Sequence, residues 1–101
     1  MEYNFIEYVQ KYPKQYAIAK SKLCINLLSF LSKSGATIKE ILASDSFHRI
    51  ELADLELLLN MLVSIKLLNK TKINNKEIYY AGEFTNLFLE EYKSTKKNYD
   101  I

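Results

Sequence analysis

The chain has 101 residues, of which 49% are hydrophobic and 26% are charged, and its net charge is +2. This length fits one domain and leaves no room for two, and the composition argues against disorder. Because there are only two glycines and one proline, we expect no glycine-rich phosphate-binding loop. The weak positive charge does not by itself indicate nucleic-acid binding.

Cysteine usage and hydropathy indicate a cytoplasmic domain. Cys24 is the only cysteine, which excludes an internal disulfide and a cysteine-based metal set, and we interpret it as a small buried hydrophobe. No apolar run approaches the roughly 18 residues that a membrane span needs. The first residues also lack the pattern of a signal peptide. We therefore expect a cytoplasmic protein without membrane contact.

The first third of the sequence predicts two helices separated by a proline. Residues 4–11 suit a short helix with an aromatic side, which Pro13 interrupts because proline has no backbone N–H to donate. A long helix then runs from Pro13 to about Lys33, since apolar residues recur at spacings of three and four. Its apolar surface is wider than a small domain usually buries with one helix.

The middle of the sequence predicts two further helices. Thr37 and Glu40 match a capping box, in which each side chain accepts a hydrogen bond from the other residue's backbone N–H. A short helix from Ile38 to about Ala43 follows, and another helix runs from about Arg49 to Lys66. The expected core stripe of this second helix contains Ile50, Leu55, Leu58, Leu59, Leu62 and Ile65, widened by Leu52, Leu57, Met61 and Val63.

The last third predicts a β-hairpin and a final helix. Asn74-Asn75 suits a two-residue turn because asparagine tolerates positive φ, and it separates strands at 70–73 and 76–81. A helix spans about 83–93, and we expect residues 94–101 to form a flexible tail. This order predicts a mainly α fold, a winged helix-turn-helix with one β-hairpin wing and additional N- and C-terminal helices, in a single domain at 1–93.

Several segments resemble the N-terminal dimerisation domain of class I S-adenosylmethionine-dependent O-methyltransferases. They are Leu-Leu-Ser-Phe-Leu at 27–31, Thr-Ile-Lys-Glu-Ile-Leu-Ala at 37–43, the leucine-rich stretch 55–68 and Ile-Tyr-Tyr at 78–80. The chain departs from that family at Lys66, where a glycine is usual, and these 101 residues do not include the methyltransferase domain. The resemblance implies a dimerisation module, or a separate partner subunit of a small-molecule methyltransferase. Less closely, the order resembles the MarR, PadR and ArsR regulators.

Aromatic residues at the start of the chain fall at helical spacing and suit either a core cap or an interface. We favour an interface, with a second copy or with a different protein, because tyrosine has an apolar ring and a hydroxyl that can stay wet. The over-supply of apolar residues in the following helix supports this interpretation. The predicted interface residues are Phe5, Tyr8, Tyr12, Tyr16, Leu23, Leu27, Phe84 and Phe88.

A DNA-binding regulator is the alternative function. Against it, the first turns of the expected recognition helix carry Glu51, Asp54 and Glu56, which would repel phosphates. In its favour, the hairpin is basic, although lysines also protect a solvated edge strand from unwanted pairing. The predicted nucleic-acid contacts of this alternative are Arg49, Lys70, Lys72 and Lys76.

No set of residues in the sequence suggests catalysis. His48 is the only histidine and lacks partners at the spacing that a metal site or a nucleophile–base pair needs, so we expect it at the surface or at a helix cap. We expect no cofactor and no metal, and we expect that the chain is not an enzyme by itself.

Overall fold

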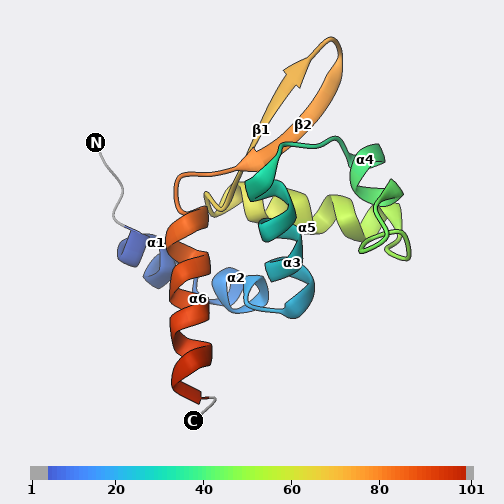
Figure 1. The fold of residues 1–101 in the computed structure, drawn as a ribbon. Helices are drawn as coiled ribbons and strands as arrows, with labels where there is room; N and C mark the ends of the chain where they lie inside the picture. Colours follow the sequence, from blue (N-terminus) through green and yellow to red (C-terminus); the bar gives the residue numbers. More distant parts are fainter. Residues whose placement is uncertain (1–4, 100–101) are drawn as a thin grey trace.

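The computed structural model describes the backbone of residues 5–99 and the side chains of residues 5–94. The fold is mainly helical with one two-stranded antiparallel hairpin (Figure 1). The elements in chain order are α1 (Phe5–Lys11), α2 (Pro13–Ala19), α3 (Lys22–Lys33), α4 (Ile38–Ala43), α5 (Leu52–Ser64), β1 (Leu68–Ile73), β2 (Lys76–Ala81) and α6 (Thr85–Tyr99).

The region predicted as one helix from Pro13 to Lys33 is two helices, so that prediction was wrong. The chain turns at Lys20 and Ser21. Ser21 then caps α3, because its Oγ accepts a hydrogen bond from the Cys24 N–H at 3.3 Å. The apolar spacing continues across the turn because both helices pack against the same core, and the sequence pattern alone therefore does not reveal the break.

The capping box at the start of α4 is confirmed. The Thr37 N–H donates to Glu40 Oε1 at 3.0 Å, and the Glu40 N–H donates to Thr37 Oγ1 at 3.2 Å. The helix itself covers the predicted residues. α5 begins later than predicted, at Leu52 instead of Arg49, because the chain makes turns over residues 45–49 first.

The hairpin follows its predicted turn. Asn74 and Asn75 have φ values of 51° and 66°, which asparagine tolerates better than most residues. β1 begins two residues earlier than expected, at Leu68. Ala36, between α3 and α4, adds a short bridge to the hairpin, exchanging two 2.9 Å backbone hydrogen bonds with Tyr79 of β2.

The connection between α5 and β1 packs tightly against the start of α6. Lys66 adopts a positive φ of 68°, a conformation that glycine adopts without cost. Gly82 lies so close that a Cβ there would come within 2.6 Å of the Lys66 carbonyl oxygen. The buried Thr85 hydroxyl donates to the Leu67 carbonyl. We call residues 65–68 the junction, because α2, α5, β1 and α6 all meet there.

The last helix extends further than the sequence predicted. α6 continues to Tyr99, past the expected end near residue 93, so the backbone at 94–99 is helical where we expected a flexible tail. Residues 100 and 101 lie outside the described part of the chain. In Figure 1 the C-terminal half of α6 extends away from the rest of the fold.

Candidate interaction surfaces

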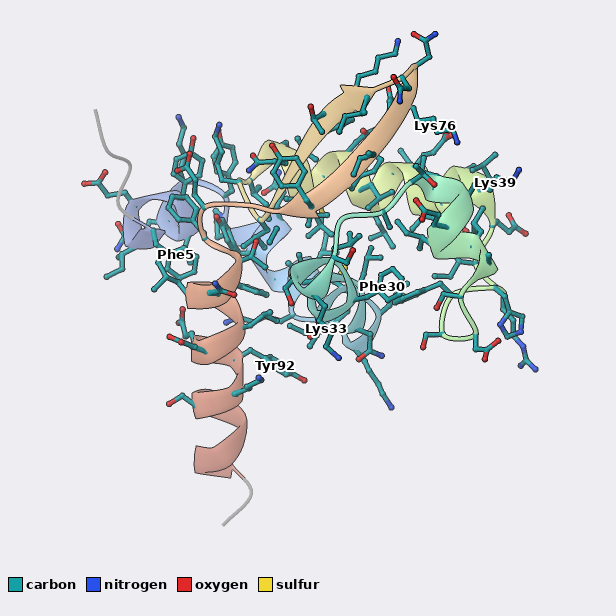
Figure 2. All side chains as sticks on the ribbon, turned by 45° about the horizontal axis from the view of Figure 1, so that its top comes forward. Phe5, Phe30, Lys33, Lys39, Lys76 and Tyr92 are labelled. Atoms are coloured by element: carbon teal, nitrogen blue, oxygen red, sulfur yellow. The ribbon has the colours of Figure 1, made fainter. Side chains whose placement is uncertain are left out.

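The predicted aromatic stripe folds together with the start of α6. Phe5 and Tyr8 of α1 each lie 5.3 Å from Phe84, measured between ring centroids, and Tyr16 of α2 lies 6.0 Å from Phe88. Figure 2 shows Phe5 beside the first turn of α6. We call this group the aromatic cluster, and its members are Phe5, Tyr8, Tyr12, Tyr16, Phe84 and Phe88.

Burial divides the eight predicted interface residues into two groups. Tyr16, Leu27, Phe84 and Phe88 are at most 5% exposed, which places them in the core of the chain and not on its surface. The aromatic residues of α1 and α2 therefore find their partners within the molecule, because they pack against α6. The other predicted residues reach the surface: Leu23 is 37% exposed, and Phe5, Tyr8 and Tyr12 are half-buried.

Tyr16 connects the aromatic cluster to the junction. Its hydroxyl donates a hydrogen bond of 2.6 Å to the Ile65 carbonyl oxygen at the end of α5. Burial raises the pKa of Tyr16 to about 12, so the hydroxyl keeps the proton that it donates. No pattern in the sequence predicts this hydrogen bond, because its partners are separated by 49 residues.

The predicted lysine cluster of the hairpin is divided between two faces. Lys70 pairs across the strands with Tyr79, and Lys72 pairs with Glu77, so both lysines lie on one face. Lys76 is the neighbour of Glu77 in β2, and successive side chains of a strand point to opposite faces, so Lys76 lies on the other face. Lys70 also lies 4.0 Å from a Glu77 carboxylate oxygen and 6.0 Å from the centre of the Tyr79 ring. The hairpin therefore presents no continuous basic patch formed by these three lysines.

Lys76 borders a shallow groove between α4 and β2. The groove is lined by Thr37, Ile38, Lys39, Glu40, Lys76 and Glu77, and Figure 2 shows Lys39 and Lys76 near each other. The pKa of Glu40 is lowered by its hydrogen bond from the Thr37 backbone, by the Thr37 hydroxyl and to a smaller extent by Lys76. Arg49, the fourth predicted nucleic-acid contact, is exposed in the turns before α5.

The outer face of α5 carries exposed leucines that sequence reasoning placed in the core stripe. Leu57 is 71% exposed and Leu52 is 52% exposed, so their assignment to the core was wrong. Leu57 lies away from the line of Leu55, Leu59 and Leu62, which are fully buried. Leu52 continues that line but lies in the first turn of the helix, where it is exposed. The only charged residues of α5 are acidic, Asp54 and Glu56, and both are exposed. We call the exposed residues Leu52, Ala53, Asp54, Glu56, Leu57 and Asn60 the outer face of α5.

The remaining candidate residues are Cys24 and His48. Cys24 is buried, as predicted, and burial raises the pKa of its thiol. His48 is exposed, with Nδ1 2.7 Å from the Asp45 carbonyl oxygen. Among the described residues, no three or more histidine, cysteine, aspartate or glutamate side chains gather as metal ligands would. No helix in the described part of the chain combines the length and apolar character of a membrane span.

Comparisons with known proteins relate the fold to one solved structure. The crystal structure of M. tuberculosis Rv0081 superposes with a TM-score of 0.67, covering 98% of this chain and 92% of that chain at 18% sequence identity. At this identity the likeness shows a shared fold alone. No protein-family model and no curated protein matches the sequence.

Proposed function

We propose that this chain is a non-catalytic protein-interaction module with a winged-helix fold. The fold part of the proposal is supported by the order α3, Ala36 bridge, α4, α5, hairpin, in which α5 takes the place of a recognition helix and β1–β2 that of the wing. The likeness to Rv0081 over nearly the whole chain is compatible with it.

The composition of the outer face of α5 is the observation that supports an interaction function. A helix that reads DNA presents polar and basic side chains to base edges and phosphates. α5 instead exposes Leu57 and Leu52 beside Asp54 and Glu56, and it contains no basic residue. Covering exposed aliphatic side chains with a protein partner lowers the free energy of the complex. Acidic side chains, in contrast, repel a phosphate backbone. This surface therefore favours a protein partner.

Co-purification of the tagged native chain, with nuclease treatment and mass identification of what is retained, tests the function. We expect a protein partner, or a second copy, that is retained by the native chain and lost with Leu57→Ser. The matched control is Leu87→Ser on α6, where the leucine is 50% exposed, and it should retain the partner. Equal recovery with both variants would contradict a role of α5. A small-molecule methyltransferase, which the sequence resemblance implies, is one partner to test directly with purified components.

DNA binding is the second candidate, and the hairpin favours it. Lys72 is exposed on one strand and Lys76 on the other, beside an exposed turn, where a wing would meet phosphates. If this function is correct, affinity for duplex DNA falls steeply as salt rises, and Lys72→Glu weakens binding. A chain that binds no duplex at low salt would rule this candidate out.

A further inference from the structure

The chain segment around the turn between α2 and α3 is rich in lysine. From Tyr8 to Lys39 the sequence contains no acidic residue, but it contains six lysines: Lys11, Lys14, Lys20, Lys22, Lys33 and Lys39. Lys20 and Lys22 are exposed at this turn, and Lys14 is exposed in the first turn of α2. Among the side chains that the structure describes, none of these three forms an ion pair within the chain. Their charge is therefore available to a partner.

The same surface exposes two aliphatic side chains. Ile18 of α2 is 51% exposed and Leu23 of α3 is 37% exposed. Lys14 and Ile18 are four residues apart on one helix and therefore share a face. We call Lys14, Ile18, Lys20, Lys22 and Leu23 the basic corner. Isolated exposed lysines are ordinary, but the basic corner combines a single sign of charge with two exposed aliphatic side chains, which a partner surface of opposite charge would complement.

Lys22 lies in the first turn of α3 and does not stabilise that helix, whereas Lys20 lies at the end of α2, where a lysine is favourable. The start of a helix has a positive partial charge, so lysine there is unfavourable and an acidic side chain is favourable. The first turn of α3 contains no acidic residue. An acidic group from outside the chain would therefore be attracted by both lysines and by the start of α3.

The outer face of α5 has the complementary composition. It presents Asp54 and Glu56 beside Leu57 and Leu52, where the basic corner presents lysines beside Ile18 and Leu23. Asp54 also stabilises the first turn of its own helix, but Glu56 lies in the second turn, where that effect has largely faded. In Figure 1 the start of α5 lies beside α4, whereas the turn between α2 and α3 lies at the opposite end from the hairpin.

We propose that the basic corner of one copy of this chain binds the outer face of α5 of a second copy. This inference rests on the proposed function, since it names the partner of α5. The two surfaces are different parts of one molecule, so the contact is head-to-tail and a further copy can add at each end. Lysine–carboxylate pairs set the orientation, and the four aliphatic side chains become covered.

Sedimentation velocity of the purified full chain tests this contact. We expect the average mass to rise with protein concentration at about 0.1 M salt and to fall toward that of the monomer at about 1 M salt, where the Debye length is only about 3 Å. Lys20→Glu/Lys22→Glu reverses the basic corner, and Asp54→Lys/Glu56→Lys reverses α5. Each variant alone should weaken self-association at least about tenfold, because like charges then face each other.

The strongest test is to mix the two charge-reversed variants and to measure whether association returns. Each reversed surface then meets a complementary one on the other variant, so an equimolar mixture should regain the association that both variants lost. Lys33→Glu/Lys93→Glu carries the same change in net charge outside the basic corner and should associate like the native chain. Circular dichroism confirms that each variant is folded, and Leu57→Ser provides a second disruption of the outer face of α5 if Asp54→Lys/Glu56→Lys fails to fold.

Three results would overturn the inference. The first is a native chain that stays monomeric at all concentrations, and the second is association that persists in Lys20→Glu/Lys22→Glu. The third is binding of duplex DNA or of phosphatidylserine vesicles that needs Lys20 and Lys22 while the chain stays monomeric. If Leu57→Ser abolishes partner binding and Lys20→Glu/Lys22→Glu does not, the proposed function stands and only the identity of the partner is wrong.

Discussion

The aromatic cluster and the outer face of α5 are both rich in apolar side chains, but they have opposite surroundings. In the cluster, Phe84 and Phe88 are at most 5% exposed, because α1 and α2 pack over them. On α5, Leu57 is 71% exposed, because no element of the described chain covers it. Apolar spacing thus indicates that a helix has a surface to cover, but the packing of distant elements decides which surface the chain covers itself.

Replacing a residue of the aromatic cluster should have the largest effect on stability. Phe88 is 2% exposed and packs on Tyr16, so Phe88→Ala should lower the free energy of unfolding by about 3–5 kcal/mol. Urea denaturation followed by circular dichroism measures this. The control Leu87→Ala removes a neighbouring side chain that is 50% exposed and should cost about 1 kcal/mol or less. Equal losses would show that the cluster is not part of the core.

Tyr16→Phe tests the hydrogen bond between the cluster and the junction. The variant leaves the buried Ile65 carbonyl without its donor, which should lower the free energy of unfolding by about 1–3 kcal/mol. Tyr80→Phe, at a tyrosine that is 38% exposed, is the matched control and should change little. A loss of the same size in both variants would argue against a special role of the buried bond.

The pH dependence of stability gives a second measure of Tyr16. Its pKa is raised to about 12 in the folded chain from an ordinary value of 10.0, so the folded state holds the proton more tightly than the unfolded state. This stabilisation is complete below pH 10.0 and is lost as the pH rises toward 12. Between these pH values the free energy of unfolding should therefore fall less in Tyr16→Phe than in the native chain. An equal fall in both would contradict the raised pKa of Tyr16.

Local chemistry predicted the elements of this fold better than it predicted their surfaces. The capping box of Thr37 and Glu40 and the turn at Asn74-Asn75 involve neighbouring residues, and both formed as predicted. The turn at Lys20 and Ser21 was missed because serine and lysine are also acceptable within helices. The cover over Phe84 and the exposure of Leu57 depend on contacts between distant segments, which helical spacing does not contain.

Lys66 adopts a backbone conformation that favours glycine. The resembling family carries glycine at this position, and Lys66 has a φ of 68°, which costs a side-chain-bearing residue about 1–2 kcal/mol. A glycine would avoid this cost, but part of the benefit would be lost because glycine makes the unfolded chain more flexible. Lys66→Gly should therefore raise the free energy of unfolding by up to about 1 kcal/mol. Lys66→Ala, which keeps the Cβ, should give no gain, and a similar rise in both variants would contradict the backbone explanation.

Leu57 should be the least important of these residues for stability and the most important for association. Because it is 71% exposed, Leu57→Ser removes almost no buried contact, and the free energy of unfolding should change by no more than about 0.5 kcal/mol. Leu59→Ala, two residues along α5 at a fully buried position, should cost about 2–5 kcal/mol. Urea denaturation and sedimentation of the same samples separate the two properties. A large loss of stability in Leu57→Ser would mean that its own chain covers this leucine in solution, and the distinction between the two regions would then disappear.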